Sequence, residues 1–428
     1  MKGGTARAVE KFLSAELNQK FVVPILLDYV YWIIHEAEKR EVETLYFLAR
    51  DGYILQKIAI QICEREHIPT FCKYLYCSRT SLRMPTYSLI GEEAFDLLLL
   101  GGYQVSRKSL LERAELNQDQ RSAVWKDCEE TFEDEEQLLS RNELERLRGK
   151  LRQSQVFHNL IIDRSKEAYS SAVGYFRQEG LFDLERVAII DSGWTGSMQR
   201  SLRQLLQSAG FQGKILGFYF GMYADPKEAK DGTYLTYHFN KAGRIRDKIP
   251  FSNNLFECLL QAPHGMTLGY GLQNGSFYPK LAPCNNGTSY EKTHAYMQEI
   301  IDIAWELGKK KPYQAFELKA AQQETRVLIK RYMAHPTSEE AELLGRYLFC
   351  DDVSESYHSW LASPEQTKQL NQYSFFRRVW RRLRSKGDGN IQPELYWPYG
   401  TIAFLPRWKQ PWHRWNVYLW ELIRYLRT

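Results

Sequence analysis

The amino-acid sequence predicts an α/β fold, with a doubly wound and mostly parallel sheet, a helical insertion and a helical C-terminal region. Three apolar runs rich in β-branched and aromatic residues, at positions 44–49, 186–190 and 214–222, lead to this prediction. Stretches with apolar residues at helical spacing separate these runs. Continuous apolar strands that alternate with amphipathic helices are typical of parallel sheets buried on both faces.

The N-terminal elements are expected to form one βαβ unit. Residues 21–40 predict an apolar helix, residues 44–49 a buried strand and residues 71–77 a second strand. The first strand breaks at Arg50-Asp51-Gly52, and the second ends at Ser78-Arg79. Polar groups therefore follow both strands, at the edge where parallel sheets bind their ligands.

The second half of the predicted core follows a charged insertion. Residues 107–155 are rich in Glu, Lys and Arg and predict solvated helices. A helix at 156–178 leads into the strand at 186–190, and the apolar spacing after Met198 predicts a helix that ends near Gly210. The strand at 214–222 then follows, so strand and helix alternate here as well.

These patterns divide the chain into five segments. Helical periodicity continues after the core, at 289–308, 313–333 and 338–349. The segments are the first part of the α/β core (1–106), the charged helical insertion (107–155), the second part of the core (156–284), a helical region (285–372) and a basic aromatic tail (373–428).

Composition and cysteine usage favour a cytoplasmic globular protein. Of the 428 residues, 44% are hydrophobic and 25% are charged, which is enough apolar material for a sizeable core. The sequence has no secretory signal pattern and no apolar run long enough to span a bilayer. The seven cysteines are scattered without a Cys-x-x-Cys pair, as expected of reduced thiols.

The C-terminal tail differs from the rest of the chain in charge and aromatic content. Residues 373–428 contain 11 Lys or Arg, 3 Asp or Glu and six of the eleven tryptophans. Apolar groups and cations recur at helical spacing within 375–384, and an apolar stripe runs from Trp412 to Leu426. This pattern favours contact with an anionic membrane surface, at the inner face of the cytoplasmic membrane. The alternative is a helix docked on the core. Nucleic acid is disfavoured because no known binding fold accompanies the basic residues.

The turn after the strand at 186–190 carries the strongest functional signal, in the sequence Asp191-Ser192-Gly193-Trp194-Thr195-Gly196-Ser197. Small residues let backbone N–H groups approach an anion at the start of a helix, where the helix dipole favours a phosphate. Asp191 is placed to accept hydrogen bonds from sugar hydroxyls or to hold Mg²⁺ through water. The alternative is that the glycines and Thr195 only cap a helix. The predicted phosphate-binding residues are Ser192, Gly193, Thr195, Gly196 and Ser197.

This turn resembles the ribose-phosphate loop of type I phosphoribosyltransferases, in which an apolar strand leads to acidic residues and Thr-Gly-x-Ser/Thr then begins a helix. The resemblance implies that the loop amides and hydroxyls bind the 5-phosphate of the ribose. It also implies that Asp191 is the second of two acids that bind the ribose hydroxyls. Ile190 stands where the family has the first acid, so that contact would come from an acid elsewhere.

The resemblance extends to the turns that follow the two N-terminal strands. It implies pyrophosphate binding at the Arg50 side chain and the Gly52 amide, with Arg79 as a further candidate. For Arg79 the alternative is a surface ion pair. Asp51 could serve as a helix N-cap instead of a catalytic group.

Four segments together are similar to one branch, the phosphoribosyltransferases of bacterial polysaccharide assembly. They read FLARDGYIL, YCSRTSLRMP, IIDSGWTGSMQ and NLFECLLQAPHGMTLGYG. The similarity implies transfer of 5-phosphoribose from phosphoribosyl pyrophosphate, bound with Mg²⁺, to a hydroxyl of a lipid-linked glycan acceptor. A separate phosphatase would then remove the 5-phosphate and leave ribofuranose in the surface polysaccharide.

Such a reaction needs a group that accepts the proton of the attacking alcohol. Glu257 and His264, in FECLLQAPHG, are the best candidates by motif, and Asp51 is a further one. The alternatives are a structural glutamate on a helix and a loop histidine that only makes hydrogen bonds. The nine histidines show no paired spacing, so no metal site built from protein ligands is predicted.

Two other hypotheses compete with the transferase. A haloacid-dehalogenase-like phosphatase acting on a phosphosugar requires Asp-x-Asp after an N-terminal strand, and here Gly193 stands two residues after Asp191. A membrane-docked scaffold that binds phosphosugars without turnover is the non-enzymatic alternative.

Overall fold

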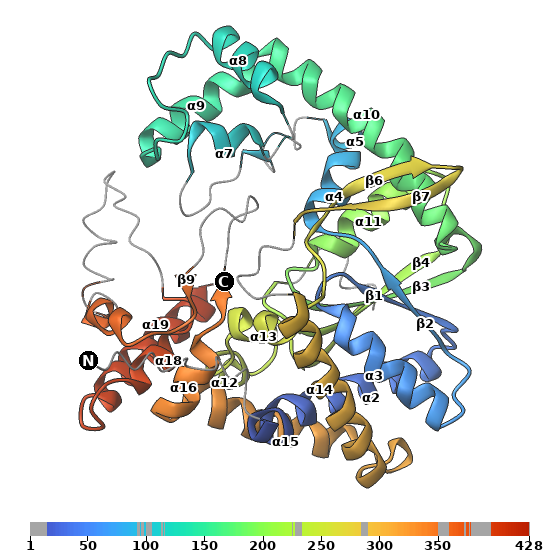
Figure 1. Cartoon of the computed structure of the whole chain (residues 1–428), viewed down its shortest axis with the longest axis vertical. Helices are drawn as coiled ribbons and strands as arrows, with labels where there is room; N and C mark the ends of the chain where they lie inside the picture. The colour runs from blue at the N-terminus through green and yellow to red at the C-terminus, as the bar shows by residue number, and fades with distance from the viewer. Residues whose placement is uncertain are drawn as a thin grey trace, which may run out of the picture.

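A five-stranded sheet in the order β2-β1-β3-β4-β5 forms the centre of the molecule, and all neighbouring strands are parallel. Helices cover both of its faces (Figure 1). The predicted α/β fold is confirmed. The strands are β1 (Thr44–Leu48), β2 (Phe71–Leu75), β3 (Arg186–Trp194), β4 (Lys214–Met222) and β5 (Tyr234–Phe239). The computed structural model describes residues 15–91, 95, 98, 99, 105–112, 114, 116–224, 226, 233–283, 290–349, 359–371, 374, 375, 377 and 395–427.

One face of the sheet packs against the N-terminal helices. Successive residues of a strand point to opposite faces, and the face that carries Phe47 and Ile190 joins a core with α2 (Val23–Lys39) and α3 (Gly52–Arg65). The Tyr29 hydroxyl of α2 donates to the backbone oxygens of Asp191 (2.9 Å) and Phe218 (3.0 Å), which ties this helix to the ends of two strands.

The opposite face carries Tyr46 and Ile189 and packs against α10 (Gln155–Gln178) and α11 (Ser197–Ser208). Leu202, Leu205 and Leu206 of α11 are all fully buried there. This apolar stripe at helical spacing holds the start of α11 at the carboxyl edge of the sheet.

The strand order reverses between β1 and β3. From β1 the chain passes through α3 to β2 on one side, whereas β3 leads through α11 to β4 on the other. Pairing between β1 and β3 ends with Phe47 opposite Ile190, and β3 then continues beside β4 as far as Trp194. In open parallel sheets, ligands bind outside the carboxyl ends of the strands at such a switch point.

The insertion forms a helical unit with its own apolar core. Val124, Trp125, Leu147 and Leu151 are buried together, and the N-terminal part of α10 completes this core. The predicted helices are therefore present, but they are not fully solvated as the charge content suggested. The helices of the insertion are α7 (Arg107–Glu112), α8 (Gln118–Asp127) and α9 (Arg141–Gln153).

The helices after the core extend the packing around α2. Helix α14 packs against α2 and α3, and α15 packs against α2, so Ile300 and Ile329 join the same buried cluster as the sheet. These helices are α14 (Tyr290–Lys310), α15 (Leu318–Ile329), η6 (Lys330–Ala334) and α16 (Ser338–Gly345).

The described part of the tail is docked on the molecule. Trp397 is fully buried, and its Nε1 donates to the backbone oxygen of Met333 (2.8 Å). It precedes α18 (Pro398–Ala403), and α19 (Gln410–Arg427) packs against α18. Most of the predicted basic stretch at 375–384 (residues 376 and 378–384) lies outside the described residues. No helix in the described part of the chain has both the length and the apolarity needed to cross a bilayer.

Two features of the sheet region differ from the prediction. Strand β3 extends four residues beyond 190, because Gly193 and Trp194 pair with β4, so the Asp191 turn is reduced to Thr195 and Gly196. The edge strand β5 and the hairpin of β6 (Thr267–Gln273) and β7 (Ser276–Leu281) were not predicted. Hairpin side chains such as Leu272 and Tyr278 are exposed, so these strands show no continuous apolar run.

Short elements complete the described structure. They are α1 (Ala15–Leu17), η1 (Asn18–Val22), α4 (Arg79–Arg83), η2 (Met84–Thr86), α5 (Tyr87–Ile90), η3 (Leu181–Asp183), α12 (Ile245–Lys248), α13 (Asn253–Leu259), η5 (Tyr313–Ala315), β8 (Leu348–Phe349), β9 (Ser359–Trp360) and η7 (Glu365–Asn371).

Candidate active site at the carboxyl edge of the sheet

A side-chain contact joins the carboxyl ends of β1 and β3 at the switch point. Asp51 stands at the N-cap position of α3, but its carboxylate caps no amide of that helix. It instead accepts a hydrogen bond from the Ser192 hydroxyl. The N-cap alternative does not account for Asp51, whose carboxylate is turned toward the end of β3.

Three carboxyl groups at this edge, those of Asp51, Asp191 and Glu257, lie near enough to influence one another's pKa. Burial and the charge of Asp51 together raise the pKa of Asp191 to about 7. Burial also raises the pKa of Glu257 to about 8, again with contributions from Asp51 and Asp191. The three residues are only partly enclosed by protein. At neutral pH the cluster therefore retains protons, and it is accessible to a ligand.

The charges of two arginines oppose this rise in the pKa of the carboxyl groups. Burial raises the pKa of Asp51, whereas the hydrogen bond from Ser192 and the charges of Arg50 and Arg79 lower it. Arg79 also lowers the pKa of Asp191 and of Glu257. Arg50 follows a cis peptide bond with Ala49, immediately before Asp51. Both predicted pyrophosphate-binding arginines thus lie near the carboxyl cluster.

Glu257 is held by a tryptophan from the end of β3. Glu257 lies on α13, and the Nε1 of Trp194 donates a hydrogen bond to its carboxylate. The Trp194 backbone is left-handed (φ 77°), and its ring packs against those of Phe251 and Phe256, with centroids 5.3 and 6.2 Å away. This packing fixes the direction of the Glu257 side chain. Sequence reasoning assigned no role to Trp194.

Three arginines gather between α4 and the start of α11. Burial lowers the pKa of Arg83, and the nearby charges of Arg79 and Arg200 lower it as well, although Tyr87 acts in the opposite direction. No ion pair of Arg79, Arg83 or Arg200 is found among the described residues, so the surface ion-pair alternative for Arg79 has no support there. A bound anion would relieve this mutual repulsion.

The N-cap of α4 fixes the position of the helix that carries Arg79 and Arg83. The Ser78 hydroxyl accepts from the Ser81 amide (3.0 Å) and donates to the backbone oxygen of Thr267 (2.6 Å). This fixes the start of α4 against the β6 strand. Arg79 and Arg83 are four positions apart, so they share one face of the helix. This four-residue spacing could have indicated Arg83 from the sequence. The prediction named neither Arg83 nor Arg200.

The predicted phosphate-binding turn is the N-terminus of α11. The Thr195 amide donates to the Gly193 oxygen (3.2 Å), and the Thr195 hydroxyl donates to Ser197 Oγ (3.3 Å). No acceptor for the amides of Gly196, Ser197 and Met198 is found in the described structure. A helix N-terminus with open amides is suited to bind an anion.

Both glycines of this turn are required by the protein itself. Gly193 has φ 115°, and a Cβ there would lie 2.3 Å from the Gly221 oxygen. Gly196 has φ 66°, and a Cβ there would lie 2.7 Å from the Tyr234 ring. Gly52 likewise fits tightly, since its Cβ would lie 2.7 Å from the Phe47 backbone. The glycines are thus explained without a ligand, and the open amides are the evidence for an anion site.

His264 is part of an aromatic group beside the site. Its Nδ1 donates to the Gly265 backbone oxygen (2.8 Å), which leaves Nε2 to accept from the Tyr74 hydroxyl (2.7 Å). Burial lowers the pKa of His264, and the charge of Arg50 lowers it further. The imidazole is therefore neutral, with both nitrogens engaged. This geometry supports the hydrogen-bonding alternative for His264 over a role as proton acceptor.

Metal binding by protein side chains has no support in the part of the chain that the structure describes. No group of three or more His, Cys, Asp or Glu residues there is arranged to hold a metal ion.

Comparisons with known proteins give no family assignment. No protein-family model matches the chain, and no curated protein is significantly similar to it.

Proposed function

We propose that this chain is a transferase that binds a phosphorylated sugar at the carboxyl edge of its sheet. The main observation is that the carboxyl groups of Asp51, Asp191 and Glu257 gather at the switch point, at the same edge as the open N-terminus of α11. Carboxylates are suitable acceptors for sugar hydroxyls, and a helix N-terminus suits a phosphate.

Within this class, we propose a phosphoribosyltransferase of bacterial surface polysaccharide synthesis. The donor is phosphoribosyl pyrophosphate, and the acceptor is a hydroxyl of a lipid-linked glycan. Mg²⁺ belongs to the donor as its pyrophosphate chelate. The support is the motif resemblance, together with the cationic group of Arg79, Arg83 and Arg200, which suits a leaving pyrophosphate.

Different residues of the site bind the leaving group, hold the ribose and accept the proton. The bond from ribose C1 to the pyrophosphate oxygen breaks and a bond from C1 to the acceptor oxygen forms. Pyrophosphate leaves toward the arginines. Asp191 holds ribose hydroxyls, and Glu257 receives the proton of the acceptor hydroxyl. A carboxylate with a pKa near 8 has a higher proton affinity than an ordinary glutamate, provided that it is ionised when the substrates bind. The charge of Arg79, which lowers the pKa of Glu257, favours that ionised form.

The product of this reaction still carries a 5-phosphate. A separate phosphatase is therefore a functional partner in this proposal, and the chain would act at the inner face of the cytoplasmic membrane, where lipid-linked acceptors are accessible.

The direct test is incubation of the full chain with phosphoribosyl pyrophosphate, Mg²⁺ and a panel of glycans. Mass spectrometry should detect an acceptor that gains one phosphopentose, with release of pyrophosphate in equal amount. Release of inorganic phosphate from a phosphoribosyl glycan would indicate the phosphatase instead. Donor binding without turnover on any glycan would indicate the scaffold.

A further inference from the structure

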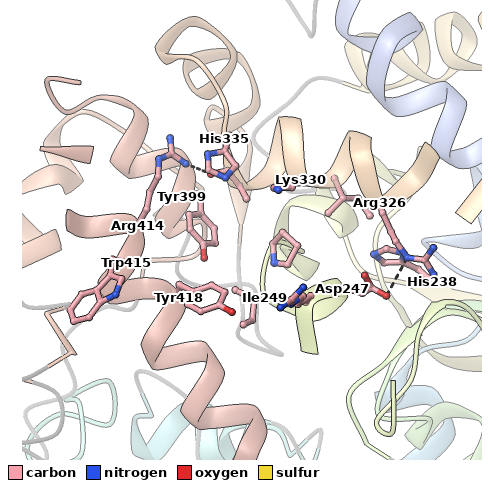
Figure 2. A pocket seen from close by; sticks show the side chains of 14 residues that line it. His238, Asp247, Ile249, Arg326, Lys330, His335, Tyr399, Arg414, Trp415 and Tyr418 are labelled. Atoms are coloured by element: carbon pink, nitrogen blue, oxygen red, sulfur yellow. Dashed lines mark hydrogen bonds and ion pairs between the residues drawn. The ribbon is translucent and has the colours of Figure 1, made fainter. Parts of the chain in front are cut away.

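A second cavity lies between the edge of the sheet and the C-terminal helices (Figure 2). Its volume is about 570 Å³, and β5, α12, α15, η6, α18 and α19 contribute its walls. An adjoining cavity of about 660 Å³ shares Arg246, Asp247 and Tyr418 with it. The rings of Phe239 and Phe251 lie between this cavity and Trp194 of the carboxyl site. The cavity is therefore separate from the site described above.

The walls of this cavity carry an excess of positive charge. Arg246, Arg326, Lys330 and Arg414 line it, and Asp247 is the one carboxylate among its described lining residues. Asp247 pairs with Arg326 at 3.2 Å. Arg414 donates only to neutral oxygens, those of Ala334 and Gln410. An anionic ligand would balance the remaining cations.

The pKa shifts of two lining groups agree with this excess of positive charge. Burial lowers the pKa of Arg414. Burial also lowers the pKa of His335, and the charges of Arg414, Lys330 and Arg331 lower it further.

A buried imidazole at the other end of the cavity is poorly satisfied by the described structure. His238 is only 5% exposed, and no well-aligned hydrogen bond to either ring nitrogen is present there. Burial and the charge of Arg326 lower its pKa to about 3, while the backbone of Asp247 acts in the opposite direction, so the ring is neutral and one nitrogen faces that backbone. A neutral imidazole offers one donor and one acceptor, so the other nitrogen is left unused. A polar ligand would satisfy it.

The mouth of the cavity continues into an exposed aromatic surface on α19. Trp415 and Tyr418 line the cavity and are also exposed to solvent. Trp412, 54% exposed, stacks on Trp415 one turn away, with ring centroids 5.5 Å apart. Leu426 extends the same stripe. Tryptophan and tyrosine on one helix face, beside cations, are typical of the membrane interface.

We propose that this cavity binds the phosphate headgroup of an amphiphilic lipid whose apolar chain lies along the aromatic face of α19. The headgroup phosphate contacts Arg246, Lys330 and Arg414. The neutral His238 ring accepts or donates a hydrogen bond at the inner end. This inference is independent of the transferase proposal, because it requires binding and no transfer.

Vesicle sedimentation with the full chain tests the site. The chain should bind vesicles of phosphatidylcholine doped with phosphatidic acid and not vesicles of phosphatidylcholine alone. The double variant Arg246→Gln/Lys330→Gln should bind the doped vesicles about 30-fold more weakly, since each lost cation near a membrane costs about 1 kcal/mol.

The matched control is Lys214→Gln/Lys319→Gln, which removes two exposed cations that do not line the cavity. It should retain the affinity of the unmodified chain. An equal loss of vesicle affinity in both double variants would mean general charge attraction and would overturn the site. Equal binding of the unmodified chain to both kinds of vesicle would overturn it as well. Deleting residues 373–428 is a poorer test, because it also removes the buried Trp397.

Calorimetry separates a lipid from free phosphate. A soluble short-chain phosphatidic acid should bind much more tightly than inorganic phosphate, and Trp412→Ser/Trp415→Ser should weaken only the lipid. If inorganic phosphate binds as tightly as the lipid, or if the tryptophan variant binds the lipid normally, the lipid assignment is wrong.

Discussion

The two sites of this protein balance their charges differently. At the carboxyl edge the fold brings Asp51, Asp191 and Glu257 together near Arg79, so acidic and basic groups share the site. In the cavity beside α19 the cations outnumber the carboxylates among the described lining residues, and the imidazole of His238 is neutral. Unbalanced or shifted charges of this kind indicate the ligand that would relieve them. The first site therefore suits a ligand with both hydroxyls and phosphates, such as a phosphorylated sugar, and the second suits a phosphate.

Removing one carboxylate should have the largest effect on the transferase. Asp191→Asn is expected to lower kcat for phosphoribosyl transfer at least about 100-fold, because the amide cannot carry the charge that a preorganised site directs at the reacting sugar. Asp163→Asn, on the exposed surface of α10, should retain full activity. Both variants should melt cooperatively. A folded Asp191→Asn enzyme with normal turnover would remove this residue from the site.

The pH dependence of stability distinguishes the two sites further. The raised pKa values of Asp191 and Glu257 mean that these groups stay protonated in the folded chain while they ionise in the unfolded chain. Their stabilising contribution is therefore complete below about pH 4 and is lost as the pH rises to about 8.

Asp191→Asn cannot ionise, so its free energy of unfolding should rise relative to that of the unmodified chain by about 4 kcal/mol between about pH 4 and about pH 8. Urea unfolding across this range measures the difference. Parallel curves for the two chains would mean that Asp191 titrates normally. His238→Phe should show a difference of the opposite sign, because His238 stays neutral in the folded chain and gains a proton below about pH 6.5 only in the unfolded chain. The unmodified chain should therefore lose stability relative to His238→Phe as the pH falls from about 6.5 to about 4.

Removing an arginine from the first site should lower activity less than removing Asp191. Arg83→Gln is expected to lower kcat/KM for phosphoribosyl pyrophosphate about tenfold, the usual cost of losing a hydrogen bond to a charged group. Arg186→Gln, at the amino end of β3 and therefore at the opposite edge of the sheet, is the control. If both variants have the same kcat/KM, the leaving pyrophosphate does not contact Arg83.

The sequence predicted the first site better than the second because of where their residues come from. Apolar runs located β1, β3 and β4, and polar groups at strand ends indicated Asp51 and Asp191. The contact between Asp51 and Ser192 depends on the strand order, which no local pattern encodes. The packing of Gly196 against Tyr234 was equally hidden, because β5 is an edge strand.

The second site could not be found by such patterns. His238 lies on the unpredicted β5, Arg326 on α15 and Arg414 on α19, and only tertiary packing brings them around one cavity. The basic and aromatic character of the tail was visible in the sequence, and so was its apolar stripe. Which of its cations line a cavity, and that Trp397 is buried while Trp412 is exposed, depends on how α18 and α19 dock.

The smallest expected effect concerns the unpaired imidazole. His238 packs among the rings of Phe220, Phe239 and Phe251, with centroids 5.5 to 6.1 Å away, so a phenyl ring should fit in its place. His238→Phe should raise the free energy of unfolding by about 1 kcal/mol, because it removes buried polar atoms that the described structure satisfies poorly. The same change should weaken binding to phosphatidic acid vesicles. Phe220→Leu, in the same aromatic group, should lose stability and keep lipid binding. If His238→Phe is less stable and binds lipid normally, the imidazole is a structural group, and the cavity lacks the polar inner end that a headgroup needs.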